Sequence, residues 1–293
     1  MIRGSELKRC TQSPYYQSLN RWAPGIAPAP AVPFCRPAPS PWNSSPRGAT
    51  CVGVMTRPSK RVLPLQLVET SRISVLTMAD VIRGRLSRTK CTRLLGEWGQ
   101  RAFHLADAEL VTHGLENYDS GQTYLLMSNH QSMFDIFALF VAFPGHLRMV
   151  AKKEMFVLPV MQQAMHAADF VRIDRGDHMK ARAALDHANE VISGGVNVWI
   201  APEGTRSQSG TMLPFKKGGF MLALQTGIKI LPVSVVGTRD ILPSKDWRVR
   251  KGGRVDIHFH APVDPTVYGL ERRDELIADV RARIESALPG YEP

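Results

Sequence analysis

A histidine and an aspartate lie five residues apart, directly after a run of apolar residues. Residues 123–128 predict a buried strand, and His130 and Asp135 follow it before an apolar helical segment. On one continuous helix these side chains would point about 140° apart, so they meet only if His130 precedes the helix. With Ser132 as the N-cap, Asp135 falls in the first turn and can reach back to the imidazole. The pattern predicts a histidine general base that an aspartate orients, able to take a proton from a hydroxyl.

A second polar cluster follows another predicted strand. Alone, a histidine and an aspartate at this spacing are ordinary loop and cap residues in most proteins. Residues 196–201 predict a buried strand that breaks into a turn. This turn carries four residues that can contact a substrate: Glu203, Gly204, Thr205 and Arg206. Gly204 would let backbone N–H groups approach an oxyanion, Thr205 adds a hydroxyl, and Arg206 offers a bidentate fork for a phosphate.

Positive charge follows two more predicted strands. Lys152 comes after residues 147–151, and Arg175 comes after residues 170–174. A single cation at such a place is usually a solvated edge residue. Several strand ends that carry a histidine, carboxylates and cations can instead converge on one anionic substrate.

The elements that position these residues alternate in type after Asn117. Strands are predicted at 124–128, 147–151, 170–174, 196–201, 230–236 and 255–259. Helices are predicted at 133–143, 154–168, 177–193, 216–227 and 271–287. This rhythm is typical of an α/β fold. Since no internal repeat or second core-sized segment is present, we predict one catalytic domain at 111–293.

Residues 1–62 form a basic, proline-rich leader. They hold nine Lys and Arg against the single acid Glu6, and ten of the 21 prolines. No apolar segment there is unbroken enough for a signal-peptide core, so the composition predicts disorder. A transit peptide and an over-extended start, with Met55 or Met78 as the true first residue, are the alternatives.

Residues 63–110 predict an amphipathic pair of helices. Apolar residues recur at helical spacing, and residues 63–95 hold six Lys and Arg against two acids. No stretch reaches the ~20 apolar residues that span a bilayer. Because basic amphipathic helices favour anionic interfaces, we predict a peripheral contact with the cytoplasmic face of the cell membrane. A helix pair that only covers the core is the alternative.

Other function classes fit less well. The formal net charge of +11 could indicate nucleic-acid binding through the leader, but no recognition motif accompanies the charge, so we predict no nucleic-acid partner. No Gly-x-Ser-x-Gly elbow is present, which disfavours a serine hydrolase. The cysteines lack metal-site spacing and indicate reduced thiols in a cytoplasmic protein without a metal site. They are Cys10, Cys35, Cys51 and Cys91.

Taken together, the polar clusters resemble the motifs of the glycerolipid acyltransferase family, typified by bacterial 1-acylglycerol-3-phosphate acyltransferase. The resemblance covers about residues 120–240, with the motifs in the family's order. Residues 129–135, 151–154, 173–175, 202–206 and 231–233 correspond to the family's blocks. Two departures concern the acceptor more than the reaction: Ala201 replaces a usual Phe, and residues 167–169 lack a common Gly.

The resemblance implies a mixed sheet flanked by helices, with His130 as general base and Asp135 as its orienting partner. It implies that Lys152, Arg175 and Arg206 hold the acceptor phosphate. The other substrate-binding residues would be Asn129, Glu203, Gly204 and Thr205.

The reaction implied is acyl transfer from acyl-CoA or acyl-carrier protein to the sn-2 hydroxyl of lysophosphatidic acid. The product is phosphatidic acid, and no cofactor is required beyond the acyl donor. A sibling enzyme that uses a lyso-ornithine lipid, glycerol 3-phosphate or another lysophospholipid is the alternative.

Overall fold

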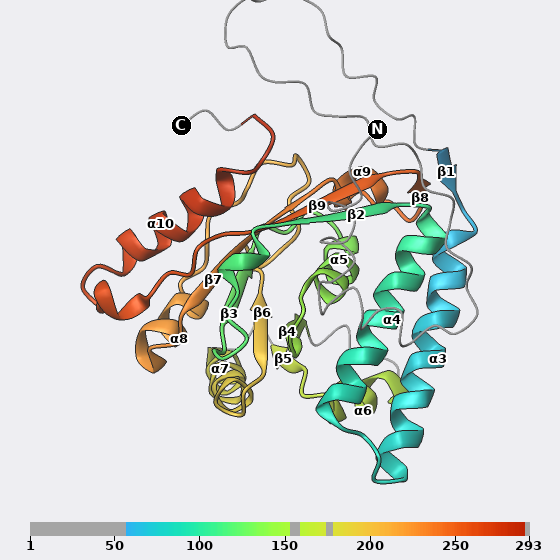
Figure 1. Cartoon of the computed structure of the whole chain (residues 1–293), viewed down its shortest axis with the longest axis horizontal. Helices are drawn as coiled ribbons and strands as arrows, with labels where there is room; N and C mark the ends of the chain where they lie inside the picture. Colours follow the sequence, from blue (N-terminus) through green and yellow to red (C-terminus); the bar gives the residue numbers. More distant parts are fainter. Residues whose placement is uncertain (1–56, 153–158, 174–177, 291–293) are drawn as a thin grey trace, which may run out of the picture. The chain divides into compact units, whose positions relative to one another are not determined.

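A seven-stranded mixed sheet forms the centre of the structure, a computed structural model that describes residues 57–152, 159–173 and 178–290 (Figure 1). All of these residues belong to the second of two compact units, which divide between Cys51 and Val52. Across the sheet the strands are β2 (Glu109–His113), β9 (Arg254–Phe259), β7 (Ile230–Val236), β3 (Leu125–Ser128), β6 (Asn197–Ile200), β4 (Leu147–Lys152) and β5 (Val171–Ile173).

Five neighbouring strands of this sheet run in the same direction. β7, β3, β6, β4 and β5 pair in parallel, whereas β9 pairs antiparallel with β7, and β2 runs parallel to β9. The carboxyl ends of the five parallel strands therefore lie along one edge of the sheet. In folds of this class ligands bind at that edge.

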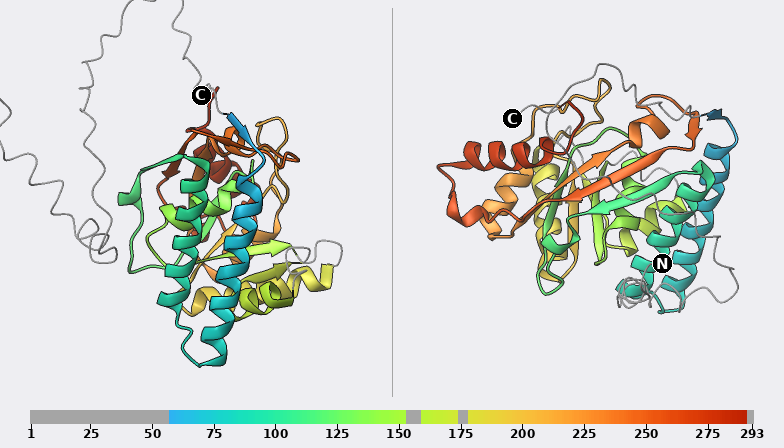
Figure 2. Two further views of the ribbon diagram at one scale, coloured as in Figure 1. Left: turned by 90° about the vertical axis from the view of Figure 1, so that its right-hand side faces the viewer. Right: turned by 45° about the horizontal axis from the view of Figure 1, so that its top comes forward.

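Alternation along β3 divides the core into two layers. Leu125 and Met127 pack on one face of the sheet, and Leu126 packs on the other. The face of Leu126 is covered by α4 (Arg88–Ala106), α5 (Phe134–Ala142) and α9 (Thr238–Ile241). The opposite face is covered by α7 (His178–Ser193), α8 (Gly218–Thr226) and α10 (Arg273–Glu285), as the right-hand view of Figure 2 shows.

Two long helices precede the sheet and lie side by side (Figures 1 and 2). They are α3 (Val62–Ile82) and α4, and α3 also packs on α6 (Pro159–Ala167). Pro64 in the first turn of α3 costs no hydrogen bond because N–H groups there have no helical partner. At the start of α4, Ser87 Oγ accepts a hydrogen bond from the Lys90 amide, and the helix ends at Asp107 with a φ of 50°.

The predicted α/β fold with a mixed sheet and a preceding helix pair is confirmed. Every predicted strand and helix is present, with ends shifted by a few residues; the starts of the predicted helices at 154 and 177 lie outside the described residues. β2 was missed, and it begins at Glu109, inside the segment assigned to the helix pair. Its pattern is weak because β2 lies at the edge of the sheet, where β9 is its one partner among the described strands.

The end of the predicted leader is ordered. Residues 57–59 form β1 (Arg57–Ser59), which pairs antiparallel with β8 (Val249–Lys251), and α3 begins at Val62. Residues 1–56, where the leader was predicted to be disordered, lie outside the described residues. Two short 3-10 helices, η1 (Leu115–Asn117) and η3 (Pro265–Val267), complete the elements described.

Candidate active site

His130 and Asp135 are in direct contact at the carboxyl end of β3. The Nδ1 atom of His130 lies 2.7 Å from Oδ2 of Asp135, whose side chain is fully buried, while the His130 side chain is 16% exposed. A carboxylate only accepts hydrogen bonds, so this contact assigns the proton to Nδ1 and leaves the lone pair on Nε2. The pair therefore has the arrangement of a general base with a fixed tautomer.

The loop before α5 explains why the two side chains meet. α5 begins at Phe134, so His130 precedes the helix as predicted, and Asp135 lies in the first turn. Oδ2 of Asp135 also accepts hydrogen bonds from the amides of Gln131 at 2.9 Å and Ser132 at 3.1 Å. These amides hold the carboxylate in place beneath the imidazole.

The predicted helix cap was wrong by one residue. Met133, not Ser132, occupies the N-cap position of α5. Ser132 lies one residue earlier, where its Oγ accepts a hydrogen bond from the Phe134 amide at 2.9 Å and donates to the Leu242 carbonyl at 2.6 Å. Its hydroxyl thus ties the loop to the segment after α9.

Thr238 completes the surroundings of the aspartate, and sequence reasoning missed it. Its hydroxyl donates a hydrogen bond to Oδ1 of Asp135, from the first residue of α9. α9 follows β7, whose carboxyl end lies beside that of β3 because the two strands are parallel neighbours. Only a prediction of the strand order, with β7 beside the strand that precedes His130, would have pointed to Thr238.

Trp199 supports the other side of the imidazole. The two rings meet edge to face, with centroids 5.9 Å apart and planes at 87°. The indole Nε1 donates to Ser128 Oγ at 2.9 Å, which fixes the ring on β6. Trp199 belongs to a buried strand, so its type and place alone indicated only a core residue.

Glu203 ties the second cluster to the first. One carboxylate oxygen accepts the His130 amide at 2.7 Å, and the other accepts the Leu213 amide at 2.8 Å. Burial raises the pKa of Glu203 above its ordinary value, although these two amides act in the opposite direction. Because both oxygens are occupied, Glu203 shapes the site through the backbone.

Two further contacts join the same loops. The Ser207 amide donates to the His130 carbonyl at 2.8 Å, and Gln131 Nε2 donates to the Gly210 carbonyl at 3.1 Å. The segment after β6 thus lies across the segment after β3. The two motifs, about 75 residues apart in sequence, form one site.

Asn129 has a positioning contact in the structure. Its side chain donates to the Val235 carbonyl and accepts from the Val235 amide, both at 2.8 Å, and it is fully buried. This pairing extends the contact between β3 and β7 by one residue and fixes the loop that carries His130. A direct contact of Asn129 with substrate stays a prediction.

The turn after β6 presents cations beside a glycine that the backbone requires. Gly204 has a φ of 72°, and its N–H donates to the Ala201 carbonyl at 3.0 Å, so this N–H is not free for an oxyanion. A Cβ at Gly204 would lie 3.0 Å from Nζ of Lys216 and closer to its stem. Lys216 therefore lies against the turn, and sequence reasoning missed it because the residue is twelve positions further along the chain.

Arg206 and Lys216 both offer unpaired positive charge. Within the described part of the chain, neither side chain makes a hydrogen bond or ion pair; Arg206 is partly exposed, and Lys216 and Thr205 are exposed. Lys152 ends β4 at the same edge of the sheet, although its side chain is not described. Arg175 lies outside the described residues.

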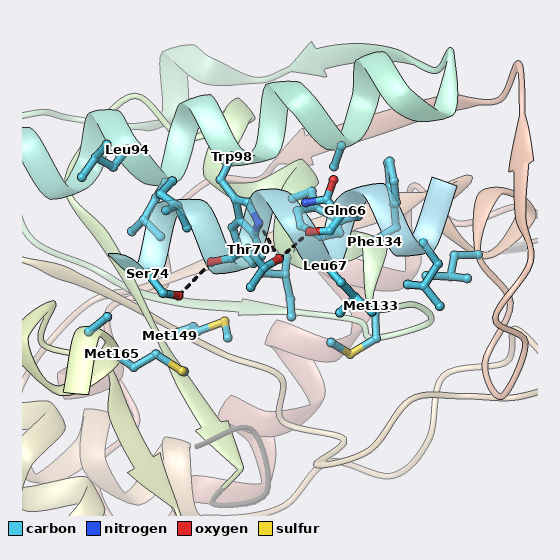
Figure 3. Close-up of a pocket in the computed structure, with 18 of the residues that line it drawn as sticks. Gln66, Leu67, Thr70, Ser74, Leu94, Trp98, Met133, Phe134, Met149 and Met165 are labelled. Carbon is cyan, nitrogen blue, oxygen red and sulfur yellow. Dashed lines mark hydrogen bonds between the residues drawn. The ribbon is translucent and has the colours of Figure 1, made fainter. Parts of the chain in front are cut away.

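An apolar cavity of about 460 Å³ adjoins Arg206 (Figure 3). Arg206 and Met133 line it together with residues of α3, α4 and α6. Leu94, Trp98 and Phe134 contribute to its walls, and Met149 and Met165 lie in its lower part in Figure 3. A cavity of this size and lining suits an extended hydrocarbon chain. Sequence reasoning indicated neither the cavity nor its lining.

The position before β5 explains one departure from the family pattern. Asp169 has a φ of 60°, a left-handed conformation that glycine adopts most easily and aspartate tolerates. The turn between α6 and β5 is therefore kept although residues 167–169 lack a glycine.

The described residues also include one group of metal-ligand type, His113, Asp256 and His258. This group lies on β2 and β9, which run opposite to β3, and no residue that contacts His130 belongs to it.

Comparisons with known proteins agree with this geometry. Residues 109–236 match the protein family described as Acyltransferase. The chain is 34% identical over 176 residues to the chloroplastic 1-acyl-sn-glycerol-3-phosphate acyltransferase BAT2 of Brassica napus. The aligned residues cover 60% of this chain and 49% of that protein. It is 31% identical over 186 residues to the mouse 1-acyl-sn-glycerol-3-phosphate acyltransferase alpha, covering 62% of this chain and 64% of that protein. The chain thus spans about half to two thirds of the length of these relatives.

A solved structure shares the fold. The crystal structure of PlsC from Thermotoga maritima, a 1-acyl-sn-glycerophosphate acyltransferase, superposes with a TM-score of 0.60 at 26% identity, covering 77% of this chain and 96% of that one. The likeness extends beyond residues 109–236, since it includes more of the chain than the family match does.

Proposed function

We propose that this chain, which matches the acyltransferase family over residues 109–236, transfers an acyl group from acyl-CoA or acyl-carrier protein to the sn-2 hydroxyl of lysophosphatidic acid. The product is phosphatidic acid. The observation that carries the proposal is the contact of His130 Nδ1 with the buried Asp135, which leaves Nε2 as a proton acceptor. The activity named for both relatives and for the solved structure supports the choice of acceptor.

Transfer begins with proton removal. His130 Nε2 takes the proton of the sn-2 hydroxyl while the hydroxyl oxygen bonds to the thioester carbonyl carbon, whose π electrons move onto its oxygen. When the carbonyl re-forms, the carbon–sulfur bond breaks, and the imidazolium gives its proton to the leaving thiolate. Asp135 stabilises the imidazolium between these two events. The step consumes no cofactor and forms no acyl-enzyme.

The acceptor is held by its phosphate. Arg206 offers a planar fork and Lys216 a point charge, and neither has a partner within the described residues. We assign Lys152 and Arg175 to the same phosphate from their motifs, with Thr205 at the edge of the site. Gly204 and Glu203 shape the turn that carries Arg206. Binding of the phosphate aligns the sn-2 hydroxyl with Nε2 of His130, and this proximity accelerates the reaction.

The acyl chain occupies the cavity beside Arg206 and Met133. Its apolar walls remove the hydrocarbon from water, and its one end lies at the residues next to Asp135. Both substrates therefore meet at His130, with the phosphate of the acceptor at the strand ends and the acyl chain of the donor between the helices.

The helix pair contacts the membrane in this proposal. On α3, Val68, Val75 and Ile82 are 64%, 58% and 81% exposed, and their spacing of seven residues puts them on one stripe. Exposed Arg83 and Arg85 follow at the turn to α4. Among the helices of the described residues, none is long and apolar enough to cross a membrane. From the exposed stripe and these arginines we assign residues 63–110, apart from the start of β2 at Glu109, to peripheral contact with the cytoplasmic face of the cell membrane, and 111–293 to catalysis.

The experiment for catalysis is thiol release from a long-chain acyl-CoA by the purified full-length chain, with and without lysophosphatidic acid. We expect release that depends on the acceptor and that His130→Ala abolishes without loss of folding. A fully active His130→Ala variant would refute the proposed base. If lysophosphatidic acid is inactive, a panel of lyso-ornithine lipid, glycerol 3-phosphate and other lysophospholipids identifies a sibling acceptor.

The experiment for the membrane is cosedimentation with vesicles of phosphatidylcholine alone or with phosphatidylglycerol. Binding should favour the anionic vesicles, and Val68→Asp with Val75→Asp should reduce it. The matched control is Val267→Asp with Leu270→Asp, because these residues are 63% and 58% exposed but lie outside the helix pair. Equal losses in both variants would contradict a specific role of α3.

A further inference from the structure

The cavity between the helices has a mainly apolar lining, and α3 contributes a stripe of polar residues to it. Gln66, Thr70, Ser74 and Thr77 all line it from α3, at successive spacings of four, four and three residues. Figure 3 shows the first three of them. This spacing puts them on one face of the helix. Arg206 and Asp246 also line the cavity, so α3 is not its only source of polar groups.

The hydroxyl groups of this stripe are satisfied within the helix. Thr70 donates to the Gln66 carbonyl at 2.8 Å, Ser74 to the Thr70 carbonyl at 2.8 Å, and Thr77 to the Ile73 carbonyl at 2.9 Å. Thr70 also accepts a hydrogen bond from Trp98 Nε1 at 3.0 Å. Such back-bonded hydroxyls require nothing from the cavity.

The amide of Gln66 is different. Its Nε2 and Oε1 atoms are the buried side-chain atoms of the described residues that have no hydrogen-bond partner, and the residue is only 7% exposed. An unpaired buried amide costs free energy that leucine or methionine at this position would avoid. In this conformation neither atom is exposed to the cavity, so a partner can pair with them only after the side chain turns. Gln66 lines the cavity and can in this way offer an unpaired amide to a molecule that enters it.

The chemistry of the amide narrows the choice of partner. Oε1 needs a donor, whereas Nε2 needs an acceptor, and a hydroxyl group is both. A ketone or ester carbonyl would serve Nε2 alone, and a plain hydrocarbon would serve neither atom. Glutamine has three rotatable side-chain bonds, through which the amide can turn towards an entering chain.

The place of Gln66 locates this hydroxyl along the chain. Figure 3 shows Gln66 on the side of the cavity where Phe134 and Met133 lie, and these residues directly precede Asp135. Met149 and Met165 lie farther along the cavity in the same view. A group that reaches Gln66 is thus nearer to the reacting carbonyl than to the end of the chain.

We propose that Gln66 selects acyl chains that carry a hydroxyl group near the thioester, by hydrogen bonding this hydroxyl inside the cavity. The inference rests on the proposed function, since it assigns the cavity to the acyl chain. It adds a substrate class, hydroxylated acyl thioesters, and a residue that distinguishes them from unsubstituted chains.

The test compares hexadecanoyl-CoA with 3-hydroxyhexadecanoyl-CoA as donors for the full-length chain. The kcat/KM of the wild-type chain should be about two- to tenfold higher for the hydroxylated donor, the ratio that one net hydrogen bond supplies. Gln66→Leu should remove this preference. The matched control is Thr77→Val, which changes a polar residue of the same stripe whose hydroxyl is already paired, and it should keep the preference. A donor with the hydroxyl at the far end of the chain should behave like hexadecanoyl-CoA.

Three results would overturn the inference. The first is a donor ratio that Gln66→Leu leaves unchanged, with only a gain in thermal stability, which would mean that the amide has no ligand. The second is an equal loss of kcat/KM for both donors in Gln66→Leu, which would mean that Gln66 contacts the CoA part that the two donors share. The third is a wild-type chain with the same kcat/KM for both donors. Gln66→Met, which keeps the length of the side chain, provides a second variant if the leucine variant unfolds.

Binding of the two donors without any acceptor separates this inference from the proposed function. If lysophosphatidic acid is not acylated, the proposed acceptor fails. A binding preference for the hydroxylated donor that Gln66→Leu removes would still support the role of Gln66, and the absence of that preference would refute it.

Discussion

Asp135→Asn tests how much of catalysis depends on the charge behind His130. The aspartate accepts hydrogen bonds from three N–H groups on Oδ2 and from the Thr238 hydroxyl on Oδ1. An asparagine can keep its oxygen on the three N–H groups and turn its NH₂ towards Thr238, whose hydroxyl can rotate to accept. The substitution therefore removes the negative charge and leaves the hydrogen-bond pattern nearly intact.

The geometry gives the expected magnitude. Opposite unit charges at the observed 2.7 Å attract by about 6 kcal/mol at an effective dielectric constant of about 20. The neutral amide retains a hydrogen bond to the imidazolium of about 1.5–3 kcal/mol. The difference of about 3–4 kcal/mol corresponds to a fall in kcat of two to three powers of ten. The free energy of unfolding should change by only about 1 kcal/mol.

The assay is acceptor-dependent thiol release, with urea unfolding of the same samples. Because Asp135 acts through His130, the double variant His130→Ala/Asp135→Asn should be no slower than His130→Ala alone. A kcat of Asp135→Asn within tenfold of wild type would refute the reasoning, and so would a double variant much slower than the histidine variant.

Three smaller predictions follow from other contacts. Gly204→Ala should lower the free energy of unfolding by about 1–2 kcal/mol because of its positive φ, and should raise the acceptor KM because the new Cβ displaces Lys216; an unchanged KM would remove that lysine from the phosphate site. Thr238→Val removes one charge-assisted hydrogen bond to Asp135, so kcat should fall about tenfold or more in the same thiol assay while acceptor KM stays constant. Burial, followed by nearby positive charge, lowers the pKa of His260 from 6.5 to about 4. The folded state thus binds fewer protons than the unfolded state in this window, so stability is complete above pH 6.5 and is lost towards pH 4, by about 2 kcal/mol after allowance for partial exposure. Urea unfolding across this range should show a shallower loss for His260→Gln, and an identical loss would assign the effect to other groups.

Local sequence patterns were sufficient to predict the motifs and their placement at the ends of strands. The apolar run before Asn129 predicted β3, and the spacing of His130 and Asp135 required a loop and a first helical turn, which the structure contains. Such inferences work because strand alternation and helix starts depend on residues only a few positions apart. The same local logic placed the cap one residue too early, because Ser132 bonds the Phe134 amide from outside the helix.

Contacts between segments far apart in the sequence could not be predicted from these local patterns. Thr238 reaches Asp135 across 103 positions, and Lys216 reaches Gly204 only because the chain folds back after the turn. β2 was missed because an edge strand with partly exposed residues has little periodicity of its own. These two contacts and the pairing of β2 depend on which segments are neighbours in the fold. The sequence pattern indicates only which faces of a strand or helix are apolar.

The sequence by itself determined the α/β class, the helix pair, and the residue types that can remove a proton and bind a phosphate. Periodicity and turn chemistry encode these features locally. The tertiary structure alone decided that β3, β6 and β7 are parallel neighbours, that Glu203 joins two motifs through backbone amides, and that α3 leaves the Gln66 amide unpaired beside a cavity. The physical reason is that strand order and side-chain pairing are set by the packing of the whole core, to which residues far apart in the chain contribute together.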